Sequence, residues 1–240
     1  MRRAVVVSML VGVAVRANAT QQKAPCAGCT FEISSAATEP VPLVVVMHGD
    51  TDTARQRAMK WRAAVERKGW ALLALDCPDE LGCDRSWYKW DHDPAWVHEQ
   101  VREVIAHHPI DRTRIYLVGW SGGATYIGMH LQAWPPTFAA AVIHGGGVEP
   151  LTSECPDRPF PAYFLVGDEN PSHGGEKRLR AFFTACNEDV RWDLVRGADH
   201  AGEDAALTEA KADQILSWLE TKRRAAPLRG RAGNSSNASI

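Results

Sequence analysis

Short apolar runs alternate with longer amphipathic segments along most of the chain. The run Leu43–Met47 is apolar at every position, which is typical of a strand buried on both faces of a parallel sheet. The runs that predict strands are Thr30–Ser35, Leu43–Met47, Ala71–Leu75, Arg114–Val118, Ala139–His144, Ala162–Val166 and Val190–Val195. The segments that predict helices are Ala54–Lys68, Pro94–His107, Gly122–Trp134, Gly175–Cys186 and Ala206–Arg224. This alternation predicts an α/β fold, a doubly wound, mostly parallel sheet with helices on both faces.

The last expected helix carries its apolar side chains on one face. Ile215, Trp218 and Leu219 recur at the i, i+3, i+4 spacing of a helix that packs against a sheet. From residue 225 onward Pro, Gly, Arg, Asn and Ser replace the apolar residues. Such a segment cannot bury enough apolar surface to become ordered, so residues 225–240 are expected to form a disordered tail.

The beginning of the chain has the pattern of a secretory signal. Two arginines precede a short apolar stretch, which ends in the small-residue pattern Ala17-Asn18-Ala19. We therefore expect residues 1–19 to be a signal peptide and the mature chain to begin at Thr20. This places the protein outside the cytoplasm, secreted or periplasmic, and no later segment is apolar enough to anchor it in a membrane.

Composition narrows the class of protein further. The chain has 240 residues, of which 45% are hydrophobic and 23% charged, and its formal net charge is −2. Residues 20–224 are enough for one domain with a substantial core. A charge so close to neutral provides no field to attract nucleic acid or anionic lipid, so neither is an expected partner.

All six cysteines follow the expected cleavage point, and an even number in an exported protein favours disulfides. Proximity along the chain suggests the pairs Cys26–Cys29, Cys77–Cys83 and Cys155–Cys186, although spacing alone does not determine the pairing. Cys26 and Cys29 also have the spacing of half a zinc site or of a redox motif. They lack a second pair at zinc spacing and do not open a helix after a strand.

The segment Gly119-Trp120-Ser121-Gly122-Gly123 directly follows the expected strand Arg114–Val118 and opens an expected helix. This order of strand, G-x-S-x-G and helix is typical of a nucleophile elbow, in which the serine lies at the apex of a tight, strained turn. Glycines two residues to either side allow the chain to approach itself closely. Ser121 is therefore the predicted nucleophile.

A reactive serine needs a histidine base and a residue that orients the base. His200 is the predicted base because it follows the last expected strand, as the order serine, acid, histidine requires. Asp168, after the strand Ala162–Val166, is the predicted acid. Glu169 and Asp199 remain alternatives for this role.

Two backbone amides are predicted to form the oxyanion hole. His48-Gly49-Asp50 ends a buried strand and turns the N–H of Asp50 toward the serine, while the N–H of Gly122 directly follows the nucleophile. Both donors would face the oxygen that becomes negatively charged during acyl transfer. His48 is interpreted as a structural residue.

With these motifs in place, residues 40–220 resemble the α/β-hydrolase superfamily and, within it, secreted polyhydroxybutyrate-depolymerase-like and feruloyl-esterase-like enzymes. The resemblance is carried by His48-Gly49, by segment 111–123 and by Asp199-His200. It implies hydrolysis of carboxylic esters through an acyl-serine intermediate, with no metal and no organic cofactor. The tryptophan-rich stretch 87–97 also resembles that group.

One position departs from the family pattern. Relatives place the acid three residues after the glycine that ends its strand, and here that residue is Asn170. Asp168 would then have to act from a shifted register. An asparagine can orient an imidazole but does not stabilise the imidazolium as a carboxylate does.

The expected substrate is a small-molecule or polymeric ester of short-chain, aromatic or polyester type, because no insertion is long enough to form a large lid. Trp87, Trp90 and Trp120 are predicted to line the substrate cleft. A weak or inactive hydrolase-fold protein that binds carbohydrate, polymer or protein is the alternative, and acyl transfer to an alcohol would use the same residues. The sequence leaves the oligomeric state open.

Overall fold

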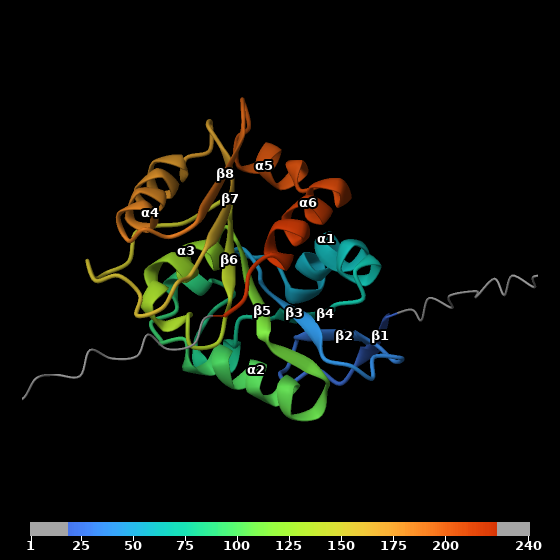
Figure 1. The fold of residues 1–240 in the computed structure, drawn as a ribbon. Helices are drawn as coiled ribbons and strands as arrows, with labels where there is room; N and C mark the ends of the chain where they lie inside the picture. The colour runs from blue at the N-terminus through green and yellow to red at the C-terminus, as the bar shows by residue number, and fades with distance from the viewer. Residues whose placement is uncertain (1–18, 225–240) are drawn as a thin grey trace, which may run out of the picture.

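A computed structural model describes residues 19–224, and these form an eight-stranded sheet with helices on both faces (Figure 1). The order of the strands across the sheet is β1-β2-β4-β3-β5-β6-β7-β8. Strands β3 to β8 run parallel to one another, whereas β2 pairs antiparallel with β1 and β4. The strands are β1 (Ala19–Gln22), β2 (Thr30–Ser34), β3 (Val41–Met47), β4 (Ala71–Leu75), β5 (Ile110–Trp120), β6 (Ala140–His144), β7 (Ala162–Gly167) and β8 (Val190–Val195). This is the fold of the α/β hydrolases.

The helices divide between the two faces of the sheet. They are α1 (Ala54–Arg67), α2 (Ala95–His107), α3 (Gly122–Met129), α4 (His173–Ala185), α5 (His200–Ala206) and α6 (Glu209–Glu220). Figure 1 shows α2, α3 and α4 on one face and α1 and α6 on the other. Each face buries its own apolar core, and alternate residues of β3 contribute to both, Leu43 and Val45 to one and Val44 and Val46 to the other. This explains why that run is apolar throughout.

All seven expected strands are present within the described residues, and the structure adds the short edge strand β1. The helix expected over Gly122–Trp134 ends earlier, at Met129. A further helix, α5, begins at His200, where the sequence predicted no helix. Its start is capped by the Asp199 side chain, which accepts from the N–H of Gly202.

The three disulfides suggested by proximity along the chain are all formed. Cys26 pairs with Cys29, Cys77 with Cys83 and Cys155 with Cys186. The last pair joins the segment that follows β6 to the C-terminal end of α4. The expected signal peptide, up to residue 18, and the expected tail, 225–240, lie outside the described residues. No helix within residues 19–224 is long and apolar enough to cross a membrane.

The long loop that the Cys155–Cys186 disulfide closes should make this pair the most stabilising of the three. The two cysteines are 31 residues apart, against 3 for Cys26–Cys29. Loop-closure entropy predicts a loss of roughly 3–4 kcal/mol when both cysteines of the long loop are replaced by serine, and roughly 1–2 kcal/mol for the short loop. Urea denaturation of the two double variants measures both losses, and equal losses would refute an origin in loop entropy.

Candidate active site

Ser121 lies at a sharp turn between the end of β5, at Trp120, and the start of α3, at Gly122. Its backbone has φ +50° and ψ −112°, a strained conformation for a residue with a side chain. A Cβ at Gly119 would lie 2.5 Å from the backbone N of Ala124, and one at Gly123 would lie 2.7 Å from the carbonyl oxygen of His48. The two glycines are therefore required by the close approach of the chain, and the turn has the backbone geometry expected of a nucleophile elbow.

His200 begins α5, directly after the loop that follows β8. It lines the same cavity as Ser121, with a volume of about 510 Å³. Its ring stacks on Trp120, the residue before the serine, with ring centroids 4.6 Å apart and planes 20° from parallel. The fold therefore brings the predicted nucleophile and the predicted base to one cavity from positions 79 residues apart in the sequence.

The environment of His200 favours its neutral form. Partial burial lowers the pKa of the imidazole below its ordinary value, and the cation of Arg57 lowers it further, while Asp204, Asp199 and Asp50 raise it. A neutral imidazole is the form that can accept a proton.

The residue that contacts the imidazole is Asn170. Its Nδ2 lies 3.2 Å from Nδ1 of His200. Asn170 is buried after β7, and the N–H of Ser172 donates to its Oδ1 at 3.0 Å. Asn170 thus contacts the imidazole at Nδ1 and leaves Nε2 without a hydrogen bond within the described residues.

Asp168 takes a different position. Its side chain is exposed, and its Oδ1 accepts from the backbone N–H of Gly197 at 2.5 Å. No hydrogen bond or ion pair within residues 19–224 joins Asp168 to His200. Glu169 is exposed, and Asp199 caps α5. The structure thus sets Asn170, three residues after Gly167, in the position that the family pattern assigns to the acid.

A buried carboxyl group lies behind Asn170. Glu203, three residues after His200 on α5, is fully buried, and its Oε2 accepts from Nδ2 of Asn170 at 2.5 Å. Burial raises the pKa of Glu203 to about 7, although the hydrogen bond from Asn170 opposes the shift. Sequence reasoning missed Glu203. The i, i+3 spacing from His200 would have identified it only if α5 had been recognised as a helix.

A second buried carboxyl, Glu176 of α4, lies nearby. Ser172 Oγ donates to its Oε1 at 3.2 Å, and His173 Nδ1 lies 3.6 Å from its Oε2. Burial, and then the charge of Glu203, raise the pKa of Glu176 to about 8. Two carboxyl groups thus lie in the interior behind the histidine, and burial raises the pKa of both.

The two predicted oxyanion donors lie at this cavity. Asp50 and Gly122 both line it, and no hydrogen bond within the described part of the chain uses the backbone N–H of either residue. The loop that carries Asp50 is held by His48, whose Nδ1–H donates to the carbonyl of Gly49 at 2.6 Å. The Nε2 of His48 accepts from the N–H of Cys77 at 3.0 Å. His48 therefore acts as a structural residue, and burial lowers its pKa.

The carboxylate of Asp50 is a feature that the sequence did not reveal. Ser86 Oγ donates to its Oδ1 at 2.9 Å. A Cβ at Gly122 would lie only 2.4 Å from that oxygen, so the carboxylate lies against the start of α3. Asp50 also lines a second, adjoining cavity of about 550 Å³, together with His200, Trp120 and Arg57.

The tryptophans predicted to line the cleft do not all reach it. Trp87 and Trp90 are buried, 0% and 2% exposed, and pack against each other and against Tyr126. Neither ring is free to stack on a ligand, because aromatic core packing covers both. Trp120 is 7% exposed at the adjoining cavity, where it supports His200. Tyr88, between the two buried tryptophans, lines the Ser121 cavity.

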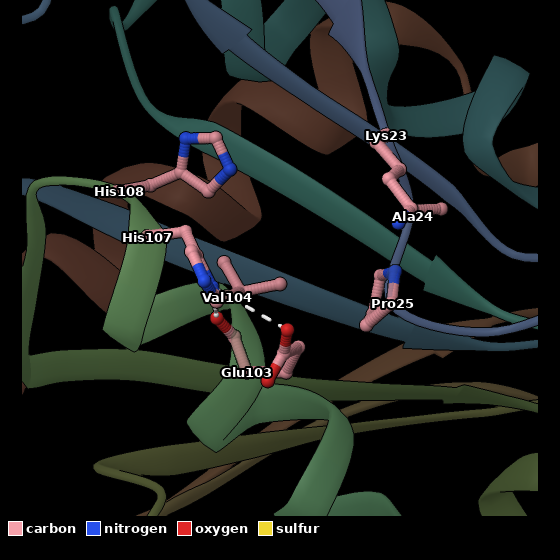
Figure 2. Close-up of a pocket in the computed structure, with 7 residues that line it drawn as sticks. All are labelled: Lys23, Ala24, Pro25, Glu103, Val104, His107 and His108. Atoms are coloured by element: carbon pink, nitrogen blue, oxygen red, sulfur yellow. Dashed lines mark hydrogen bonds and ion pairs between the residues drawn. The ribbon is translucent and has the colours of Figure 1, made fainter.

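Another cavity, of about 340 Å³, lies outside this site (Figure 2). Figure 2 shows the segment Lys23–Pro25 facing Glu103, His107 and His108 at the end of α2. None of the residues that line it belongs to the catalytic group. Within residues 19–224 no three or more His, Cys, Asp or Glu side chains are grouped so as to hold a metal ion.

The elbow, the order of the strands and the position of His200 after β8 define an α/β hydrolase. The family model described as Esterase PHB depolymerase matches residues 29–153, about half of the chain. The protein therefore belongs to the PHB-depolymerase family of esterases. Poly(3-hydroxyalkanoate) depolymerase C of Paucimonas lemoignei is 30% identical over 130 residues, which are 47% of this chain and 30% of that protein.

Solved structures share the fold at low sequence identity. A thermostable esterase superposes with a TM-score of 0.62 at 20% identity, over 86% of this chain and 63% of its own. S-formylglutathione hydrolase from Staphylococcus aureus has a TM-score of 0.60 at 12% identity, over 87% of this chain and 99% of its own. The chain therefore spans less than two thirds of the depolymerase and of the thermostable esterase.

The buried Glu176 should make stability fall as the solution becomes alkaline. Its pKa is raised to about 8 in the folded chain, from 4.5, so the folded state binds more protons between these values. Its contribution is complete below pH 4.5 and is lost as the pH rises to 8. Glu176→Gln should therefore be more stable than the wild type at pH 8, by a few kcal/mol, and similar to it at pH 4.5. Urea unfolding at several pH values measures this.

The control for this experiment is Glu99→Gln, since Glu99 is exposed on α2. It should unfold like the wild type at every pH. A Glu176→Gln profile parallel to that of the wild type would contradict the assignment.

Proposed function

We propose that this protein is an exported serine esterase that cleaves carboxylic esters through an acyl-serine intermediate. The observation that carries the proposal is the strained turn at Ser121, which shares a cavity with His200 and with the two free amides of Asp50 and Gly122. Membership of an esterase family supports the same reaction class. Three disulfides within the described residues support export to an oxidising compartment.

The chemistry follows from these positions. Ser121 Oγ attacks the ester carbonyl and transfers its proton to Nε2 of His200, while the carbonyl oxygen becomes an oxyanion held by the N–H groups of Asp50 and Gly122. When the tetrahedral intermediate collapses, the carbon–oxygen bond to the alcohol breaks and His200 gives its proton to the departing oxygen. Water then repeats the sequence on the acyl-serine, releasing the acid and restoring Ser121.

The shape of the cleft supports a short-chain, aromatic or polyester substrate. The Ser121 cavity has apolar walls from Tyr88, Val148 and Pro171, whereas the adjoining cavity is lined by charged side chains that include Asp52 and Arg57. The two cavities share Asp50 and His200. We infer that an apolar acyl group occupies the first cavity, and that the alcohol part, or the next unit of a polymer, extends toward the second.

Asn170 favours a second candidate function, a hydrolase fold that binds an ester, polymer or carbohydrate with little turnover. A neutral amide does not stabilise the imidazolium that forms during the reaction. A fluorophosphonate probe separates the two functions, since it labels only an activated serine.

Replacing the nucleophile is the most direct test of the esterase. Ser121→Ala should lower kcat for p-nitrophenyl butyrate about 10³-fold or more, because no other group can form the acyl intermediate, and should abolish fluorophosphonate labelling. Ser217→Ala, on the exposed surface of α6, is the matched control and should retain both. Activity and labelling that survive Ser121→Ala would exclude the proposal.

Asn170→Asp should increase kcat, by about 10- to 10³-fold. A carboxylate at this position would accept from Nδ1–H of His200 and stabilise the imidazolium, and the converse change in serine proteases costs about 10⁴-fold. Steady-state kinetics on the same ester measures the gain. Asp168→Asn tests the acid predicted from the sequence: if Asp168 is the acid, this variant loses activity and Asn170→Asp gains none.

A further inference from the structure

The side chains around Asn170 fix the direction of its amide. The N–H of Ser172 can only donate, and it points at Oδ1 of Asn170 at 3.0 Å. The Nδ2 of Asn170 therefore faces both Oε2 of Glu203, at 2.5 Å, and Nδ1 of His200, at 3.2 Å. An amide nitrogen carries two hydrogens and no acceptor lone pair, so it donates to both.

The orientation of the Asn170 amide determines which ring nitrogen of His200 carries the proton. If Nδ1 of His200 accepts from Asn170, the proton of the neutral ring resides on Nε2. Nε2 then has no lone pair with which to accept the proton of Ser121. The arrangement around an ionised Glu203 therefore holds His200 in the tautomer that cannot act as the base.

A neutral Glu203 permits the opposite arrangement. Its O–H donates to Oδ1 of Asn170 once the amide has turned over, and the same oxygen accepts from Nδ1–H of His200. The reversal gives up the bond from Ser172 and the two that Nδ2 donates, and it forms two bonds in their place, both of them to Oδ1. Glu203 takes up one proton from solvent, and the ring proton moves from Nε2 to Nδ1 by exchange with water, so Nε2 becomes free to accept.

We propose that Glu203, acting through the amide of Asn170, is a positioning residue that sets the tautomer of His200 and so makes the base competent only while the buried carboxyl is protonated. This inference rests on the proposed esterase function. Glu203 does not touch the substrate cavity: it is fully buried, and within the described residues its Oε1 has no hydrogen-bond partner. Burial disfavours the charged form of this carboxyl group, although Asn170 and the backbone N–H groups of Gly167 and Gly145 oppose that effect.

The other groups around Glu203 do not replace Asn170 in this role. Glu176 faces it from α4, with His173 beside that carboxyl. His144 of β6 donates from Nε2 to the backbone carbonyl of Glu203 at 3.0 Å, and burial lowers its pKa to about 3, so it stays neutral. On the next position of α5, Asp204 is paired with Arg57 and Lys60. Asn170 is the one of these neighbours whose side chain bridges Glu203 and His200.

The proposal is tested by the pH dependence of the wild type. Burial lowers the pKa of His200 and raises that of Glu203 to about 7. Activity should therefore rise as His200 loses its proton and fall again, by about tenfold or more between pH 7 and 9, as Glu203 ionises. The rate at which Ser121→Ala hydrolyses p-nitrophenyl butyrate is subtracted at each pH as the background that does not depend on Ser121.

Glu203→Gln replaces the ionisable carboxyl group with a neutral amide. The fall in esterase activity above pH 7 should therefore disappear in this variant, whatever the size of its kcat. Glu176→Gln is the matched control, because it removes the other buried carboxyl and leaves the contact with Asn170 intact, so it should keep the fall. A fall that persists in Glu203→Gln, or one that disappears in Glu176→Gln alone, would overturn the role of Glu203.

The tautomer of His200 can also be measured by NMR in the wild-type protein, with no substrate present. In ¹⁵N-histidine-labelled wild-type protein, the His200 signals should move from the Nδ1–H to the Nε2–H pattern as the pH rises through 7. A constant tautomer across pH 6 to 9 would overturn the inference even if the esterase is active. A tautomer change in a protein with no Ser121-dependent hydrolysis would instead support the switch and reject the esterase.

Discussion

The backbone at Ser121 is the constraint about which this site is arranged. A residue with a side chain is held at positive φ because β5 must end and α3 must begin within one residue, and the chain passes so close to itself that Gly119 and Gly123 have no space for a Cβ. The conformation persists because the parallel strands on either side hold it: Ser121 donates its N–H to the carbonyl of His144, at the end of β6. The strain exposes the hydroxyl and aims the first amides of α3 at the same space.

The predicted site residues that lie together at one cavity are those that local patterns indicated. An apolar strand followed by G-x-S-x-G led to Ser121, the end of β3 led to Asp50, and the last strand led to His200. The disulfide pairs followed from proximity along the chain. Each of these predictions needed only the order of elements and the rule that parallel strands end at one edge of the sheet.

The parts that were missed depend on packing between distant segments. The turn after β7 directs Asn170 inward and Asp168 outward, which the adjacent residues 167–170 do not reveal. Trp87 and Trp90 have the composition of a binding surface but meet Tyr126 in the core. Glu203 was concealed because Gly and Asp residues made α5 resemble a loop, and because nothing local indicates that a charged residue is buried.

The interior behind His200 combines two requirements that usually oppose each other. Burying Glu176 and Glu203 disfavours their charged forms, and their proximity adds electrostatic repulsion. A serine hydrolase, by contrast, requires a stabilised positive charge on the histidine as the reaction proceeds. Here the neutral amide of Asn170 separates the buried carboxyl group of Glu203 from the ring, so no carboxylate contacts Nδ1 of His200 directly.

The hydrogen bond from the backbone of Cys77 to His48 connects the loop that carries Asp50 to a disulfide bond. Cys77 is joined to Cys83, and the imidazole that receives its N–H also holds the carbonyl of Gly49, next to the donor Asp50. This loop is thus braced by a disulfide, which forms in an oxidising environment. Reduction of this disulfide would therefore remove a support of the loop that carries Asp50.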